Sequence, residues 1–112
     1  MDIQDLILVG KLGKTIKIKN SVDGKATGQC LEIRLVTPTA EEIKAIGESP
    51  DVAEFVSYFV ASIGEKVYVS EERPALREEL GKIQAAVLGF LNKQCAELLD
   101  EQNKFVEDLA KK

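Results

Sequence analysis

The sequence predicts an α+β fold: an N-terminal antiparallel β-hairpin packed on a mainly helical remainder with a long C-terminal helix. Two short segments, 15–19 and 29–37, alternate apolar and polar residues, which is the period of a strand. After them the apolar residues recur every three or four positions, the helical period. The length of 112 residues, 45% hydrophobic, is that of one soluble domain. We expect a single domain, 1–112, with a β-hairpin region at 1–36 and a helical region at 37–112.

The hairpin follows from the alternation and from the turn residues between the strands. In TIKIK, Ile16 and Ile18 fall on one face and the lysines on the other, and QCLEIRLVT repeats the pattern. The turn NSVDGK, with a looser shoulder at 26–28, joins the strands because Asn, Asp and Gly tolerate tight backbone geometry. Residues 2–9 fit either a helical turn or a first strand.

The stretch GKLGKT before the first strand resembles the end of a phosphate-binding loop. That loop requires Gly, four residues, then Gly-Lys-Ser/Thr at the start of a helix, so that backbone N–H groups surround the phosphates. Counting back from Gly13, the position where the loop requires its first glycine is occupied by Leu8. The segment that follows has the pattern of a strand and not of a helix. We therefore expect no nucleotide site. The local lysines fit a solvated strand face better than a basic binding patch; they are Lys11, Lys14, Lys17, Lys19 and Lys25.

A short capped helix is predicted directly after the second strand. It has two alternative starts: Thr37 as N-cap with Pro38 at the first helical position, or Thr39 with Glu42 as a capping box. Gly47 ends this helix.

A second helix is predicted to begin with Ser49 as N-cap and Pro50 in the first turn, and to be closed by Gly64. Its apolar residues lie at intervals of three and four and form one face. This pattern predicts core packing, in preference to a ligand pocket, for its two phenylalanines. The face comprises Val52, Phe55, Val56, Phe59, Val60 and Ile63.

Residues 65–70 follow as a third strand or a connector, and a long helix is predicted over 74–109 with Ser70 as a candidate cap. It divides into two helices if Gly81 or Gly89 breaks it, because glycine costs about 1 kcal/mol relative to alanine within a helix. The second half outruns so small a core, so we expect an exposed apolar stripe that binds a partner or further copies of the chain. Burial of this stripe within the monomer is the alternative. The stripe consists of Leu98, Leu99, Phe105, Val106 and Leu109.

Residues that carry enzyme chemistry are scarce. The chain contains no histidine, the usual participant in zinc sites, catalytic triads and proton shuttles. Carboxylates occur as adjacent pairs such as Glu41 and Glu42, whose side chains diverge on a helix. Cys30 and Cys95 are expected to be reduced and buried. We expect no enzyme activity, no catalytic or metal site and no cofactor.

Charge and the N-terminal sequence narrow the class of partner and the location. A formal net charge of −4 disfavours binding to the phosphates of nucleic acid. The N-terminus carries acids instead of the basic start of a signal peptide, and its apolar run is too short to span a bilayer. We therefore expect no nucleic-acid or membrane partner and a cytoplasmic location.

Four segments follow one another along the chain: the strand GKTIKIK, the strand CLEIRLVTPTAEEI running into a capped helix, the helix SPDVAEFVSYFVASIG, and the long charged C-terminal helix. This order resembles that of a known family, the small tail assembly chaperones of long-tailed bacteriophages (siphoviruses). The resemblance implies a multimeric protein without a cofactor, acting in the host cell cytoplasm. Its partners would be the hydrophobic, helical tape measure protein, which it keeps soluble, and the tail tube protein that polymerises around it. The terminal AKK is also compatible with the ribosomal frameshifting that extends some members.

Two other classes of function are compatible with the same residues. In a structural subunit of a virion or other assembly, the long helix would form permanent contacts, and stable self-assembly without a client would favour this class. In a small regulatory or ligand-binding module, the hairpin and helices would enclose a pocket. A compact monomer stabilised by metabolites would favour that class.

Overall fold

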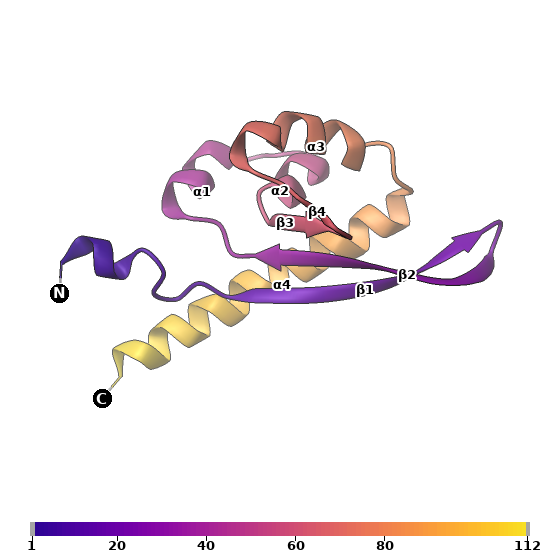
Figure 1. The fold of residues 1–112 in the computed structure, drawn as a ribbon. Coiled ribbons are helices and arrows are strands. Elements are labelled where there is room, and N and C mark those ends of the chain that lie inside the picture. The colour runs from indigo at the N-terminus through magenta and orange to yellow at the C-terminus, as the bar shows by residue number, and fades with distance from the viewer. Residues whose placement is uncertain (1, 112) are drawn as a thin grey trace.

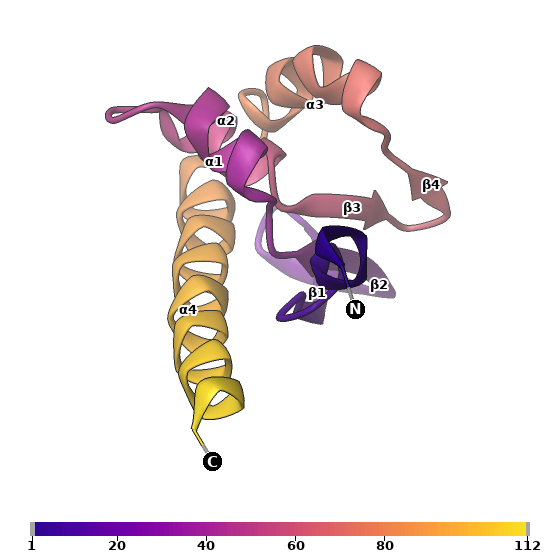
Figure 2. The ribbon, with the colours of Figure 1, turned by 90° about the vertical axis from the view of Figure 1, so that its left-hand side faces the viewer.

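The computed structural model describes residues 2–111 and confirms the α+β class (Figure 1). Four antiparallel strands form one sheet in the order β1-β2-β3-β4. The strands are β1 (Gly13–Val22), β2 (Lys25–Val36), β3 (Val60–Ile63) and β4 (Lys66–Val67). The helices are α1 (Ala40–Ile46), α2 (Val52–Ser57), α3 (Arg73–Leu80) and α4 (Ala85–Ala110). In Figures 1 and 2, α4 runs beside the hairpin, and its C-terminal end extends beyond the remaining elements.

The hairpin is longer than the alternation predicted. Its turn consists of two residues, Asp23 and Gly24, with φ of 50° and 80°, the positive values that a tight hairpin turn requires. The predicted shoulder at 26–28 lies within β2. There the register shifts opposite the step from Lys19 to Ser21, and Gly28 takes a φ of 85°. The bulge lets both strands continue beyond the predicted turn.

The second of the two predicted starts of α1 is correct. Thr39 Oγ1 accepts a hydrogen bond from Glu42 N (3.2 Å), and Glu42 Oε1 accepts one from Thr39 N (3.0 Å). This capping box satisfies two N–H groups that have no partner inside the helix. Gly47 ends the helix with a φ of 78°, as predicted.

The second helix ends earlier than predicted, and its N-cap is Asp51 in place of Ser49. After Ser57 the chain turns, and Val60–Ile63 pairs with β2 as strand β3. The predicted helix up to Gly64 is therefore wrong. Periodicity does not separate a short apolar run in a helix from one in a buried strand. Here residues 60–63 form a strand because they provide hydrogen-bond partners for backbone groups of β2 that would otherwise have none. The region 37–112 consequently contains two strands.

The long predicted helix is broken at the first of its two glycines. Gly81 follows α3, and α4 begins at Ala85, whereas Gly89 lies inside α4. Ser70 begins a short 3₁₀ helix, Ser70–Glu72, and is not the cap of α3. Within 65–70, β4 forms a two-residue strand on β3. Residues 2–9, for which a helical turn and a first strand were the two alternatives, contain a 3₁₀ helix, Ile3–Leu6.

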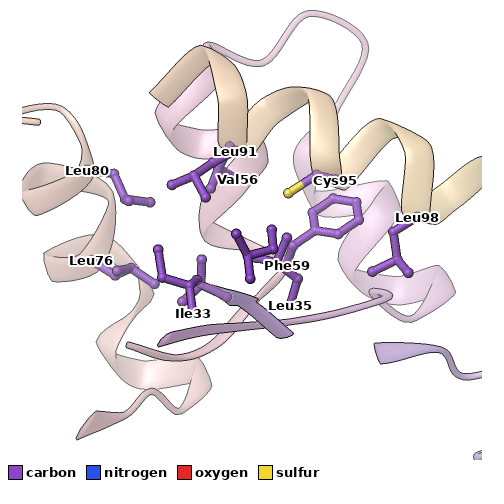
Figure 3. Packing of buried hydrophobic residues seen from close by; sticks show 11 residues of the cluster. Ile33, Leu35, Val56, Phe59, Leu76, Leu80, Leu91, Cys95 and Leu98 are labelled. Atoms are coloured by element: carbon purple, nitrogen blue, oxygen red, sulfur yellow. The ribbon is translucent and has the colours of Figure 1, made fainter. Parts of the chain in front are cut away.

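The core lies between the sheet, α2, α3 and the first half of α4. Figure 3 shows side chains from these elements converging. Phe59 is fully buried and its ring centroid lies 4.9 Å from that of half-buried Phe55, so core packing is confirmed for this pair. Cys95 is fully buried, but Cys30 is exposed on β2, so its predicted burial is wrong. The buried cluster comprises Ile16, Ile33, Leu35, Val56, Phe59, Val60, Leu76, Leu80, Leu91, Cys95 and Leu98.

Candidate partner-binding surface

The second half of α4 extends beyond the hydrophobic core. A helix of 26 residues is about 39 Å long at a rise of about 1.5 Å per residue, whereas the two shorter dimensions of the molecule are 27 and 25 Å. Leu91, Cys95 and Leu98 are at most 1% exposed, whereas Phe105 is 41% and Leu109 53% exposed. The helix therefore leaves the core after Leu98 while its apolar pattern continues.

The predicted stripe is divided by this boundary. Leu98 is buried, so its predicted exposure is wrong, and Leu99 is half-buried against the core cluster. Phe105, Val106 and Leu109 are exposed as expected. Folding back within the monomer thus buries the first part of the stripe and leaves the second part open.

Gly10, which follows the N-terminal apolar run, lies beside the exposed part of α4. Gln102 Nε2 donates a hydrogen bond to the carbonyl oxygen of Gly10 (3.2 Å). A Cβ at Gly10 would lie 2.9 Å from Val106 Cγ2, and Gly10 has a φ of 83°, so glycine is required on both grounds. These contacts join the two ends of the chain.

Both ends expose large apolar side chains, and we call these two groups the terminal apolar surface; Gly10 links them through its contacts with Gln102 and Val106. Its members are Ile3, Leu6, Ile7, Leu8, Val9, Phe105, Val106 and Leu109, with exposed fractions from 41% to 76%. Sequence reasoning missed the N-terminal members, although the run LILV before a glycine was their signal. Large clusters of exposed apolar residues in a soluble protein typically mark sites of association.

The charged residues of the C-terminal half of α4 are mainly acidic. From residue 100 onward four acids accompany two described lysines, and the acids are Asp100, Glu101, Glu107 and Asp108. The ion pair of Lys111 with Asp108 (3.7 Å) is exposed and therefore weak. The C-terminal half of α4 therefore carries more negative than positive charge beside its exposed apolar residues.

A separate cavity of about 820 Å³ lies between α2, α3 and the start of α4. Its guanidinium groups are engaged by carboxylates: Arg77 Nη2 lies 2.7 Å from Asp51 Oδ2, and Arg73 pairs with Glu42 while stacking 4.2 Å from the Tyr58 ring centroid. The pKa of Asp51 is lowered because its carboxylate accepts a hydrogen bond from a backbone N–H and another from Arg77. Arg73 Nε, in contrast, is buried without a hydrogen-bond partner among the described residues.

A metal site within the described residues, 2–111, requires several ligating side chains close together. No group of three or more His, Cys, Asp and Glu side chains in this range is arranged to hold a metal ion. Burial raises the pKa of the Cys95 thiol to about 12, so it is neutral and inert near neutral pH. Over the same range, none of the helices combines the length and apolar character needed to cross a bilayer.

Comparison of the chain with protein-family models, curated proteins and solved structures gives no match.

Proposed function

We propose that this protein is a tail assembly chaperone of a long-tailed bacteriophage, which binds the hydrophobic, helical tape measure protein and keeps it soluble until tail tube subunits assemble around it. The observation that carries the proposal is the terminal apolar surface, built on a helix that continues beyond its own core. The role is non-catalytic and requires no cofactor. It places the protein in the host cell cytoplasm.

The spacing on α4 suits a helical client. Phe105 and Leu109 are one turn apart, and Val106 lies beside them, so they form a ridge along one helix face. An amphipathic client helix buries its own i, i+3 and i+4 residues against such a ridge. The N-terminal 3₁₀ segment adds apolar side chains from a second element, which enlarges the area that a client can cover.

The same surface supports action as a homo-oligomer. A long apolar client presents many helical segments, and several copies of a 112-residue chain are needed to cover them. A formal net charge of −4 on each copy disfavours non-specific aggregation of the coated client.

Co-expression with the long apolar-helix protein encoded beside this chain tests the proposal. The variant Phe105→Asp/Leu109→Asp introduces charges where a client would exclude water, at a cost in binding. Ile43→Asp/Val67→Asp is the matched control, because Ile43 on α1 and Val67 on β4 are 43% and 66% exposed and lie elsewhere. Circular dichroism verifies that each variant is folded.

We expect the native chain and the control to keep the client soluble and to elute with it as a multimeric complex. The variant in α4 should stay folded and lose the client. Equal solubilisation by both variants would show that this surface does not bind it. Stable assembly of the chain alone, without any effect on the client, would favour a structural subunit.

The cavity between α2 and α3 favours one alternative, a small regulatory or ligand-binding module. Its volume of about 820 Å³ is in the range of small-molecule sites. A screen of thermal unfolding against metabolites tests this alternative. A stabilising compound whose effect is lost in Tyr58→Ala, on a chain that does not bind the tape measure protein, would replace the chaperone proposal.

A further inference from the structure

Strand β1 is an uncovered edge of the sheet. It lies at one end of the order β1-β2-β3-β4 and pairs with β2 only. Its ten residues make it long for an edge strand. The outer face of β1 is exposed at Thr15, Lys17 and Lys19.

The register identifies which backbone groups of β1 are free. Thr37 N donates to the carbonyl oxygen of Leu12 (3.0 Å), which makes Leu12 and Thr37 a hydrogen-bonded pair. In an antiparallel ladder such pairs alternate with non-bonded ones. Ile16 and Ile18 therefore bond to β2, whereas the N–H and C=O groups of the intervening Lys17 point away from it, as do those of Thr15 and Lys19.

The opposite side of β2 follows the same alternation. Gly64 N donates to the carbonyl oxygen of Glu32 (2.7 Å), so Glu32, which lies across from Lys17, directs its backbone to β3. Three successive alternate residues of β1 thus present donors and acceptors at an open edge, the arrangement that an added strand can bond to.

An apolar hollow lies next to this edge. It has a volume of about 370 Å³ and lies between β1 and the first half of α4. Ile18 lines it from β1, and Ala86, Val87 and Phe90 line it from α4. Phe90 is 45% exposed. A residue of an added strand opposite Ile18 would direct its side chain to the same face, into the hollow.

The charges at the edge select the partner. Lys17 and Lys19 project from the outer face, and Arg34 extends across β1 so that its Nη1 donates to Thr15 Oγ1 (3.4 Å). The single carboxylate paired with these lysines, Glu32, lies 3.6 Å from Lys17 and is itself largely exposed. Pairing of β1 with a second copy of β1 would bring lysines together, which is unfavourable. The charge complement is an acidic strand.

We propose that β1 binds an extended segment of an acidic partner protein by antiparallel strand addition, with acidic side chains opposite Lys17 and Lys19 and an apolar side chain between them in the hollow beside Phe90. The segment is an interaction site separate from the terminal apolar surface and recognises a strand in place of a helix. The inference does not depend on the identity of the client proposed above.

A blocked peptide of alternating Glu and Val tests the proposal, titrated to millimolar concentration into the ¹⁵N-labelled full chain. We expect amide shifts centred on 15–19. N-methylation of the Glu amides, which face β1, should weaken binding at least about tenfold because it removes the donors of the ladder. N-methylation of the Val amides, which face away, is the matched control and should change binding less than about twofold.

Protein variants test the charge and the hollow separately. Lys17→Glu/Lys19→Glu should weaken binding at least about tenfold at low salt, and less at high salt, because exposed charges are screened. Lys44→Glu/Lys104→Glu makes the same change in charge at exposed positions on α1 and in the last part of α4, and serves as control.

The hollow is tested by Phe90→Ala, which should weaken binding about fivefold or more because an apolar contact is lost. Ile43→Ala, at a similar exposure of 43%, should have no effect.

The proposal is overturned if the peptide produces no shifts, if shifts centre on the terminal apolar surface, or if both N-methylated peptides bind equally. A peptide of Glu and Gly that binds as tightly as the Glu and Val peptide would reduce the site to a basic patch. An oligonucleotide that displaces the peptide and binds more tightly would identify a nucleic-acid surface in its place.

Discussion

Two leucines on α4 separate the core of this protein from its candidate binding surface. Leu98 is 1% exposed and Leu109 is 53% exposed, although both belong to the same helix and the same apolar pattern. Figure 3 places Leu98 near Cys95 and Phe59, where it faces the core. The same substitution at both positions, Leu98→Ala and Leu109→Ala, therefore isolates the effect of burial.

The magnitude follows from the atoms removed. Each substitution removes three carbon atoms, worth about 2.4 kcal/mol when they are fully buried, at about 0.8 kcal/mol per carbon. At Leu98 the cavity adds to this loss, and we expect the free energy of unfolding to fall by about 3–5 kcal/mol. At Leu109 about half of the transfer term applies, and the higher helix propensity of alanine offsets part of it, so we expect a loss below about 1 kcal/mol.

Urea unfolding followed by circular dichroism measures both losses. Small domains have stabilities of about 5–15 kcal/mol, so Leu98→Ala should lower the midpoint markedly at an unchanged m-value, whereas Leu109→Ala should stay close to the native chain. Equal losses at the two positions would refute the boundary of the core after Leu98. A large loss at Leu109 would show that the end of α4 is buried against another part of the molecule or another copy.

Three further predictions concern other elements. A maleimide should modify exposed Cys30 rapidly in the native protein and buried Cys95 only after denaturation. Mass spectrometry of the labelled chain measures both reactions, and fast labelling of both thiols would contradict the burial of Cys95. The carboxylate of Asp51 has a lowered pKa, so its stabilisation is fully present above its unfolded pKa and is lost as pH falls through its folded pKa. Asp51→Asn should reduce stability at pH 7, and the difference should begin to shrink at about pH 4 and vanish only at pH values below the folded pKa, whereas a difference independent of pH would count against an ionised cap. Gly47→Ala should lower the stability of the protein by about 1–3 kcal/mol because of the positive φ at this position. Gly89→Ala should raise it by about 0.5–1 kcal/mol, because a Cβ inside α4 at this position meets no atom within 4 Å. Thermal melts that reverse this order would contradict the backbone geometry.

Local signals in the sequence correctly predicted the elements whose conformation depends on near neighbours. The alternation around Ile16 predicted a strand, and Thr39 with Glu42 was one of the two predicted starts of α1 and the one that the structure adopts, because cap and strand preferences act over two to four residues. Gly81 and Gly89 were both possible breaks, and local propensity could not choose between them, because the two glycines have the same intrinsic cost.

The candidate site was predicted only in part, because local signals identify an apolar helix face but not which of its residues the rest of the molecule covers. The spacing of apolar residues indicated which face of α4 would be apolar, but the burial of Leu98 and the exposure of Phe105 depend on where the sheet ends. The N-terminal members of the terminal apolar surface were missed because the link between their segment and α4 consists of contacts between residues far apart in the sequence, such as the hydrogen bond across 92 residues between Gln102 and Gly10. No periodicity encodes such a contact.

The sequence by itself determined the α+β class, the hairpin, the presence of a capped helix after it and the apolar face of α4, since each follows from local backbone preference and from which residues avoid water. Only the tertiary structure decided that Val60–Ile63 forms a strand, where the apolar face of α4 leaves the core, and which edge of the sheet stays open. These features depend on pairing and packing between distant segments: β2 needs a partner for its free backbone groups, and a core of fixed size covers only part of a helix of 26 residues.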